Sequence, residues 1–375
     1  MAIWKFPEWI DAGRITAVLV ALEAVSNPRG SSIPLGWNHD GITSFILSGK
    51  QGNFHTLNPP VSWMQKNRST LGNRPLSQIC MLGTHDAGMS FVSHADFPRG
   101  LVDPFVLCQS TPVYGQLVLG SRYLDIRPEI SGGDFWTGHY SGKLGGRGES
   151  MANIITGVNR FLSDNAELVI LNFSHSLQTD VSGDWRSFNR DEWHKLMQEL
   201  QQLQNLFVVQ DETKAKDLSL LTLDDFIGNG RGAVICVMED DSLDLGDFKK
   251  RGFYKPSQLN VRNEYSNTDD AVNMVKDQLK KMKDNMSIKD KRLFLLSWTL
   301  TQQIRIEPNI AKLVLLLKNL KSIKTMAYTA NKALVTELLP VVDKNSFPNV
   351  VYLDFVDNLS YVALVMAVND KVFNN

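Results

Sequence analysis

The sequence predicts an α/β fold: a distorted TIM (β/α)8 barrel with a small β-rich N-terminal extension. Two observations lead to this prediction. Short apolar runs rich in β-branched residues recur from residue 76 onward, and continuous apolar runs are typical of strands buried on both faces of a parallel sheet. Most of these runs are separated by segments with the apolar spacing of amphipathic helices, as alternating strands and helices require.

Eight apolar runs are expected to be the barrel strands, and each ends in polar residues. They cover residues 79–83, 122–127, 135–139, 168–173, 233–238, 258–261, 293–298 and 350–355. The gap between the second and third runs is too short for a helix, so the barrel is expected to be irregular there. An open doubly wound sheet is the alternative. Such sheets usually carry a Gly-rich first turn for phosphates, and residues 83–88 do not form one.

Helical spacing and turn residues divide the chain further. Apolar residues recur at helical intervals in segments 151–162, 192–203, 270–282, 310–320 and 333–339. Before residue 76 the chain instead holds strand-like runs, at 14–23 and 42–47, between clusters of Pro, Gly, Asn and Ser. We therefore expect a β-rich extension over residues 1–75 and the barrel over residues 76–375.

Composition argues against several classes of protein. The 43% hydrophobic share of the 375 residues is enough for a folded core. Lys plus Arg total 39 against 40 for Asp plus Glu, so the basic excess of a nucleic-acid-binding protein is missing. No apolar run reaches the roughly 18 residues of a transmembrane segment, and the run at 15–22 lacks the basic start of a signal peptide. We expect a soluble or membrane-peripheral protein, with its compartment unassigned and a secreted form left open.

Three cysteines, Cys80, Cys108 and Cys236, permit at most one disulfide and form no CxxC pair. This count disfavours a disulfide framework and a structural zinc site. Cys80 and Cys236 lie inside apolar runs and are expected to be small buried side chains.

Polar residues follow the strand runs at the end where barrel enzymes carry their chemistry. The first run ends in His85 and Asp86, the second in Asp125 and Arg127, and the third in His139. Two imidazoles can serve as general base and general acid near neutral pH. An Arg between them can bind a phosphate and stabilise charge that develops on it. This set suits cleavage of a phosphodiester by an internal hydroxyl, with no metal required.

These residues resemble the X domain of phosphatidylinositol-specific phospholipase C, most closely its bacterial-type, metal-independent branch. The resemblance spans about residues 76–360. It is carried by Leu-Gly-Thr-His-Asp-Ala-Gly at 82–88, Arg-Tyr-Leu-Asp-Ile-Arg at 122–127, the segment of His139, and the segments 168–173, 259–265 and 351–354. The Gly-Thr-His-Asp segment with a downstream Asp-x-Arg is the most specific part, and the later segments fall in the order of the family.

The resemblance implies an enzyme that cleaves phosphatidylinositol or a related inositol phospholipid to diacylglycerol and inositol 1,2-cyclic phosphate. It implies that His85 is the general base for the inositol 2-hydroxyl and that Arg127 neutralises the phosphoryl oxygens. His139, oriented by Asp86, would be the general acid, and Asp354 would orient His85. The expected partner is the phospholipid at a membrane surface, and the protein is expected to be a monomer.

The resemblance also implies a set of substrate-binding residues. Tyr265 matches an aromatic residue against which the family stacks the inositol ring, and Asn263 stands where bacterial relatives place an Asp that binds inositol hydroxyls. Asp125, Ser174 and His175 complete the expected set, although ordinary structural roles remain the alternative for His175 and Tyr265.

Other positions depart from the family. Tyr140 follows His139, where the family usually has Gly. Glu239 falls near the position where bacterial relatives place a basic residue that contacts inositol. Calcium-dependent relatives place Asn, an acidic residue and Glu where this chain has Asp86, Arg127 and Ser174. Because an Arg would occupy the position of the cation, no calcium and no other cofactor are expected.

Two further questions stay open. The segment 91–107 carries apolar side chains that either contact a bilayer or cover the barrel; they are Phe91, Val92, Phe97, Leu101, Val102, Phe105 and Val106. The alternatives to the enzyme are a catalytically weak barrel that binds a lipid or a partner, and a metal-dependent glycerophosphodiesterase. The latter would need a cluster of Glu and Asp near the first His, where this chain has Arg127.

Overall fold

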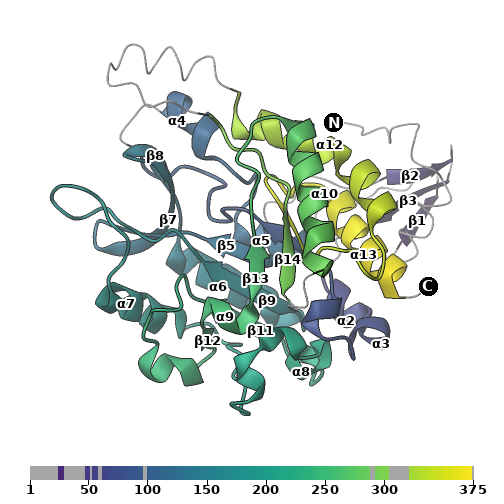
Figure 1. Cartoon of the computed structure of the whole chain (residues 1–375), viewed down its shortest axis with the longest axis horizontal. Helices are drawn as coiled ribbons and strands as arrows, with labels where there is room; N and C mark the ends of the chain where they lie inside the picture. The colour runs from purple at the N-terminus through teal and green to yellow at the C-terminus, as the bar shows by residue number, and fades with distance from the viewer. Residues whose placement is uncertain are drawn as a thin grey trace.

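The computed structural model describes residues 24–28, 47–50, 53–57, 61–95, 99–287, 292–303 and 321–373. Within these ranges eight parallel strands form one curled sheet, in the order β12-β11-β9-β5-β4-β15-β14-β13 (Figure 1). The strands are β4 (Met81–Thr84), β5 (Ser121–Ile126), β9 (Leu168–Phe173), β11 (Ala233–Val237), β12 (Phe253–Tyr254), β13 (Val261–Asn263), β14 (Leu293–Ser297) and β15 (Val350–Leu353). In the described residues no ladder joins β12 to β13, so the barrel is open there. The distorted TIM barrel is confirmed.

Burial on both faces explains why most of these strands are continuous apolar runs. In β9, Leu168 and Ile170 belong to one apolar cluster, while their neighbours Val169 and Leu171 belong to another. Successive side chains of a strand point to opposite faces, so each face of β9 packs against its own apolar layer. A strand in this position has no solvated face that could hold polar residues.

The run at residues 135–139 is not a barrel strand, and this prediction was wrong. It lies in β7 (Asp134–Ser141), which pairs antiparallel with β6 (Pro128–Ser131) and β8 (Leu144–Ser150). The short β10 (Leu177–Gln178) completes this second sheet by pairing with β6. The short gap after β5 therefore reflects an antiparallel ribbon, which needs only a tight turn, and not a parallel crossover.

Helices cover the barrel where the apolar spacing placed them. Four of the expected segments lie in α6 (Met151–Asp164), α7 (Arg190–Leu200), α10 (Ala271–Ser287) and α12 (Ile323–Val341), and the fifth, 310–320, lies outside the described residues. A capping box begins α7, because the Asn189 side chain accepts from the backbone of Glu192, whose carboxylate accepts from the backbone of Asn189. In Figure 1, α12 and α13 (Leu359–Phe373) lie on the right and the ribbon β7–β8 on the left.

Helix α13 was missed because it lacks a polar face. Tyr361, Val362, Val365 and Val368 are all buried in the apolar cluster of the barrel, and a helix buried on most sides shows no amphipathic period. The remaining helical turns are short; they are α2 (Trp63–Lys66), α3 (Arg68–Leu71), α4 (Arg99–Val106), α5 (Val113–Val118), α8 (Leu223–Ile227), α9 (Pro256–Leu259), η1 (Leu76–Gln78), η2 (Lys214–Lys216), η3 (Leu218–Leu220) and η4 (Gly246–Lys250).

Three strands are described before the barrel. They are β1 (Ala24–Pro28), β2 (Leu47–Lys50) and β3 (Asn53–Leu57), and they form an antiparallel sheet in the order β1-β3-β2. The run expected at 42–47 reaches the described residues only at Leu47, and the run at 14–23 lies outside them. A division of the chain at residue 76 stays a prediction.

A buried ion pair ties the segment before β4 to the barrel. Arg122 of β5 contacts Glu167 at 2.7 Å, and both side chains are fully buried. The Glu167 carboxylate also accepts from the backbone N–H groups of Met64 and Gln65, at 3.2 and 2.8 Å. Arg122 in turn donates to the carbonyl of Val61 at 2.5 Å. The pair is thus satisfied by backbone that precedes the first barrel strand.

Glu149, at the end of β8, offers a test of the packing. Its carboxylate is buried and accepts from the backbone N–H of Val113 at 3.1 Å. Burial raises the pKa of Glu149 to about 7, although the hydrogen bond from the Val113 N–H acts to lower it. An unfolded chain gives this group an ordinary, lower pKa, so its contribution favours folding below the ordinary pKa and is lost as pH rises toward 7.

We therefore expect the free energy of unfolding of Glu149→Gln to increase relative to that of the native protein as the pH rises from 5 to 8. The gain in the free energy of unfolding should reach about 3 kcal/mol, because one pKa unit is worth about 1.4 kcal/mol. Urea unfolding of both proteins at the two pH values measures it. A difference between the proteins that stays the same at pH 5 and pH 8 would contradict the raised pKa.

Candidate active site

The candidate site lies at the carboxyl ends of the barrel strands. His85 follows β4, Arg127 follows β5, Ser174 follows β9 and Asp354 follows β15. These residues line a cavity of about 390 Å³. All the expected site residues except Asp86 line it; they are His85, Asp125, Arg127, His139, Ser174, His175, Asn263, Tyr265 and Asp354. Asp86 lies beneath the cavity floor and is fully buried.

His85 is held between a carboxylate and a guanidinium. Its Nδ1 lies 2.7 Å from Oδ1 of Asp354, and its Nε2 lies 2.6 Å from Nη2 of Arg127. A guanidinium has no acceptor, so Nε2 must accept from it and the ring proton sits on Nδ1. Burial lowers the pKa of His85, the carboxylates of Asp354 and Asp125 raise it, and the net result is a pKa above its ordinary value. The ring therefore has a basic Nε2 that faces Arg127 and the cavity.

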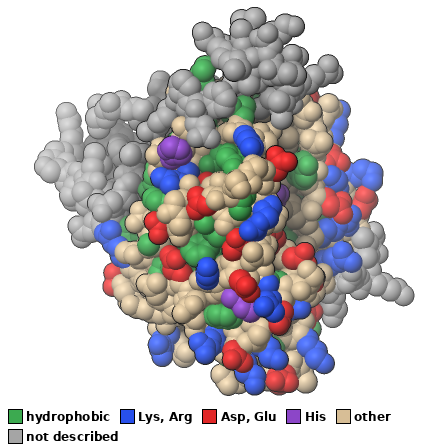
Figure 2. All heavy atoms as spheres, turned by 90° about the vertical axis from the view of Figure 1, so that its left-hand side faces the viewer, with side chains coloured by type: hydrophobic (Ala, Val, Ile, Leu, Met, Phe, Trp, Pro, Cys, Tyr) green, Lys and Arg blue, Asp and Glu red, His purple; other side chains and the backbone are tan. Residues whose placement is uncertain are grey.

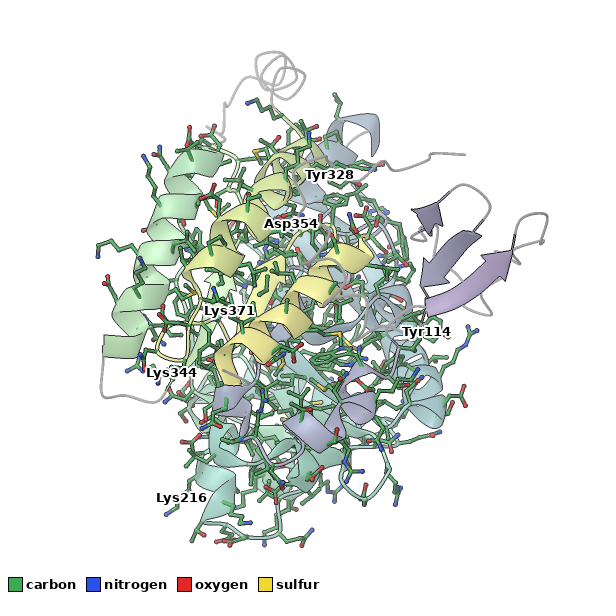
Figure 3. All side chains as sticks on the ribbon, turned by 90° about the vertical axis from the view of Figure 1, so that its right-hand side faces the viewer. Tyr114, Lys216, Tyr328, Lys344, Asp354 and Lys371 are labelled. Atoms are coloured by element: carbon green, nitrogen blue, oxygen red, sulfur yellow. The ribbon has the colours of Figure 1, made fainter. Side chains whose placement is uncertain are left out.

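Asp354 is buried, and a side chain of α12 hydrogen-bonds to its backbone. Its side chain is only 3% exposed, and its backbone carbonyl accepts from Asn331 of α12 at 3.0 Å. Figure 3 shows Asp354 at the end of its strand, behind the C-terminal helices. The side-chain amide of Gln109 links the same region by donating to the carbonyls of His85 and Leu353, at 2.8 and 3.1 Å. These contacts set the orientation of the His85 ring.

Arg127 is oriented by two carboxylates. Its Nε donates to Oδ2 of Asp125 at 3.1 Å, and its Nη1 lies 3.5 Å from Oδ2 of Asp86. Burial lowers the pKa of Arg127, but Asp125 and Asp86 raise it above its ordinary value, so the guanidinium stays charged. Burial raises the pKa of Asp125, but the positive charge of Arg127 and the hydrogen bonds from Ser174 and Tyr352 lower it, and the pKa falls below its usual range.

The Asp125 carboxylate is already occupied by protein donors. Besides Arg127, it accepts from the hydroxyl of Ser174 at 2.6 Å and from that of Tyr352 at 2.7 Å. In this arrangement Asp125 and Ser174 position the arginine. Tyr352 was missed as a site residue, although it stands two residues before Asp354, where strand alternation puts both side chains on one face.

His139 lines the cavity, as expected. It reaches the cavity from β7 of the second sheet and not from a barrel strand. Its ring centroid lies 6.3 Å from that of His85, edge-on. Its Nδ1 lies 3.4 Å from Oδ2 of Asp86 and 3.3 Å from the carbonyl of Val106. Two carboxylates, Asp354 and Asp86, thus stand behind two imidazoles.

Asp86 and His139 form a coupled pair of titratable groups. Burial and the positive charge of Arg127 lower the pKa of His139 to about 3. Burial raises the pKa of Asp86 to about 7, partly opposed by Arg127. Of the two groups, the carboxyl therefore holds a proton more tightly, and the two titrate as a unit. A negative charge beside His139 would draw the proton onto the imidazole.

The fold resembles that of solved phospholipases. No family model matches the chain. A mutant of the phosphatidylinositol-specific phospholipase C of Staphylococcus aureus matches 84% of this chain and 97% of its own, with a TM-score of 0.56 and 16% identity. The enzyme of the same name from Listeria monocytogenes matches 82% and 98%, with a TM-score of 0.55 and 17% identity. The chain has the phosphatidylinositol-specific phospholipase C fold.

Curated sequences point to the same family. The variant-surface-glycoprotein phospholipase C of Trypanosoma cruzi is 29% identical over 190 residues, 43% of this chain and 47% of that protein. A PI-PLC X-box domain-containing protein of Dictyostelium discoideum is 27% identical over 131 residues, 32% of this chain and 17% of that protein. The matched region thus spans about half of the first relative and less than a fifth of the second. The resemblance to the phosphatidylinositol-specific phospholipase C X domain is confirmed.

The expected head-group contacts lie at the rim of this phospholipase C fold. Tyr265 is 58% exposed at the cavity mouth, and Asn263 ends β13 beside it. His175, with a φ of 53°, contacts the Ser174 hydroxyl through Nδ1 at 2.9 Å. Glu239 does not line the cavity, because its carboxylate accepts from the hydroxyl and backbone N–H of Ser176.

The apolar segment that follows β4 mostly covers the barrel. Val102 and Phe105 of α4 are buried against Ile323 and Ala327 of α12. Val92 and Val106 are also buried, Phe91 is 37% exposed, and Phe97 lies outside the described residues. In the described part of the chain no helix has the length and hydropathy needed to cross a membrane. Figure 2 shows basic and acidic side chains interspersed on the face it presents.

Proposed function

We propose that this chain is a phosphodiesterase that cleaves phosphatidylinositol, or a related inositol phospholipid, at a membrane surface. The products would be diacylglycerol and inositol 1,2-cyclic phosphate. The observation that carries the proposal is the set of His85, Arg127 and His139 around one cavity, with a carboxylate behind each imidazole. The fold and the names of the relatives support the same class of reaction.

The first step frees the base. A phosphoryl oxygen of the substrate binds Arg127 and takes the place of His85 Nε2 as the partner of Nη2. Nε2 then accepts the proton of the inositol 2-hydroxyl while that oxygen attacks phosphorus in line. Asp354 stabilises the imidazolium that forms, because it accepts from Nδ1 at 2.7 Å.

The second step completes the cleavage. The bond from phosphorus to the glycerol oxygen breaks, and His139 gives that oxygen a proton to release diacylglycerol. The proton reaches His139 from Asp86, because the negative phosphate raises the pKa of the imidazole. Arg127 neutralises the charge that builds on the phosphoryl oxygens, and buried donors held in advance are effective in this role.

We also propose that the reaction needs no divalent metal ion. The positive charge beside the phosphate would come from Arg127, whose pKa is raised by Asp125 and Asp86. The metal-dependent glycerophosphodiesterase alternative would require acidic ligands where Arg127 stands.

The head group is best tested with more than one lipid. Glu239 falls near the position where bacterial relatives place a basic inositol contact, and it does not line the cavity. The relative from Trypanosoma cruzi carries a variant surface glycoprotein in its name. We therefore propose that a glycosylated inositol lipid is a substrate alongside phosphatidylinositol.

Phosphorus NMR of the products tests the function. The protein is incubated in excess chelator with vesicles of phosphatidylinositol, and in parallel with a glycosylated inositol lipid. We expect the resonance of a five-membered cyclic phosphodiester from the native protein and none from His85→Ala. Absence of that signal with both lipids would contradict the proposal, and activity that appears only on addition of calcium or magnesium would favour the metal-dependent alternative.

A further inference from the structure

Three potential metal ligands lie close together at Nδ1 of His139. They are the thiol of Cys108, Nδ1 of His139 and the carboxylate of Asp86. We propose that they form a binding site for a thiophilic divalent cation, foremost zinc, and that the bound ion inhibits the phosphodiesterase. The inhibition rests on the proposed function, whereas the metal site does not.

The distances match a tetrahedral site. Nδ1 of His139 lies 3.4 Å from Sγ of Cys108 and 3.4 Å from Oδ2 of Asp86, and all three ligand atoms lie within 4.8 Å of one another. Zinc binds sulfur at about 2.3 Å and nitrogen or oxygen at about 2.0–2.2 Å, which places neighbouring ligand atoms about 3.3–3.6 Å apart. The two distances from Nδ1 of His139 therefore already fit a zinc site.

A fourth position is available beside these ligands. The carbonyl oxygen of Val106 lies 3.3 Å from Nδ1 of His139 and 3.6 Å from Sγ of Cys108. That oxygen, or a water molecule that hydrogen-bonds to it, would complete four-coordination.

Asp86 provides an independent observation. Its side chain has no exposed surface, and within the described residues neither carboxylate oxygen makes a hydrogen bond. Two basic side chains, Arg127 and His139, lie 3.5 and 3.4 Å from this carboxylate. Buried oxygens without a hydrogen bond are rare in folded proteins, and a bound cation would satisfy this carboxylate. The other possible group, Cys108 with His85 and Asp354, lacks this feature because its carboxylate already bonds His85 at 2.7 Å.

Ligand chemistry sets the choice of ion. A thiolate and an imidazole select zinc and similar ions over calcium and magnesium, which prefer oxygen ligands. On binding, the thiol proton and the proton held by the Asp86 carboxyl both leave as the bonds from the metal to Sγ and to the carboxylate oxygen form. The two negative charges of the thiolate and of Asp86 neutralise the charge of the dication. Arg127 and His85 are paired with other carboxylates, those of Asp125 and Asp354.

Occupation of this site would stop the second step of the proposed reaction. A cation on Nδ1 of His139 separates the ring from Asp86, which supplies its proton. The Nε2–H of a metal-bound imidazole is a weaker acid than an imidazolium, so the leaving glycerol oxygen would go unprotonated. The same ion leaves the fold and the rest of the cavity in place.

Cobalt(II), which mimics zinc in such sites and absorbs light, tests the metal site without any substrate. Chelator-treated protein is titrated with cobalt and then with zinc. We expect visible bands of tetrahedral cobalt and a near-ultraviolet thiolate-to-cobalt charge-transfer band, both removed by zinc. Cys108→Ser and Cys108→Ala should lose the charge-transfer band, and Cys236→Ser, a matched change at a buried thiol in β11, should keep it. Circular dichroism confirms the fold of each variant.

Zinc affinity gives the second readout. Loss of a residue that only supports a ligand costs about 10–100-fold in metal affinity, so loss of the Cys108 thiolate should weaken zinc binding by more than about tenfold. A cobalt spectrum without the thiolate band, or a band that survives in both Cys108 variants, would overturn the site.

The inhibition is judged separately from the site. Each protein is assayed with phosphatidylinositol vesicles relative to its own activity in chelator, and the zinc concentration for half-inhibition should rise more than about tenfold in Cys108→Ser. A cobalt spectrum that follows expectation with no inhibition by zinc would overturn the inhibition alone. A protein inactive under all conditions would count against the proposed function, while the cobalt spectrum would still decide the metal site.

Discussion

Replacing His85 with alanine is expected to lower turnover of phosphatidylinositol by about 10²–10⁴-fold, the usual contribution of a positioned general base. The structure gives the reason in two contacts: Asp354 holds Nδ1 at 2.7 Å, and Nε2 faces Arg127 and the cavity. Without the imidazole, the inositol 2-hydroxyl would have to lose its proton to water. Initial rates on phosphatidylinositol vesicles in chelator measure the effect.

His175→Ala is the matched control for this experiment. His175 lines the same cavity, but its Nδ1 contacts only the neighbouring Ser174 hydroxyl among the hydrogen bonds described here. We expect its turnover to stay within about tenfold of the native rate, since it takes no part in proton transfer. Equal losses in the two variants would mean that His85 acts through general packing of the cavity and is not the base.

Arg127→Lys is expected to lower turnover by about 10²–10³-fold, the cost of removing one preorganised donor from a developing oxyanion. Lysine keeps the charge, but a single ammonium cannot reproduce the fork that spans Asp125, Asp86 and His85. Arg186→Lys is the control, because Arg186 lies in an exposed pair with Glu192 and its replacement should leave turnover unchanged.

Chemical rescue separates a catalytic role of Arg127 from a structural one. Guanidinium ion added to Arg127→Ala should restore part of the lost turnover and should not affect Arg186→Ala. A variant that unfolds at ordinary temperature, or that shows no rescue while its fold is intact, would count against phosphate stabilisation by this side chain.

Most of the barrel could be predicted because its strands are buried on both faces. Such strands are continuous apolar runs, and the site residues stand directly after them. Because the carboxyl ends of parallel strands meet at one edge, the positions of His85, Arg127, Ser174 and Asp354 along the chain were enough to predict that they meet in space.

His139 shows where this reasoning ends. It was expected on a third barrel strand, and it arrives on an antiparallel ribbon that leaves the barrel after β5. Alternation and apolarity indicate that a segment is a strand, but not which sheet it joins, because pairing depends on residues far away in the chain. The two-residue strand β12 was missed for a related reason: so short a strand has no period to detect.

The supports behind the catalytic side chains had no local signal at all. Gln109 joins the ends of β4 and β15, and Asn331 holds the carbonyl of Asp354 from α12. These contacts join segments more than 20 residues apart, and an amide side chain in a loop or helix is unremarkable in sequence. Only the folded chain reveals them.

The buried pair of Arg122 and Glu167 has a practical consequence for shortened forms of the protein. A chain begun at residue 76 would keep all of the proposed catalytic groups, yet it would remove Val61, Met64 and Gln65, whose backbone groups bond this pair. The charged side chains of Arg122 and Glu167 would then be exposed on the side of the barrel that residues 61–65 cover, and water would have to replace the lost backbone partners. The smallest unit that folds is therefore longer than the smallest unit that carries the chemistry, and a truncated version should begin before residue 61.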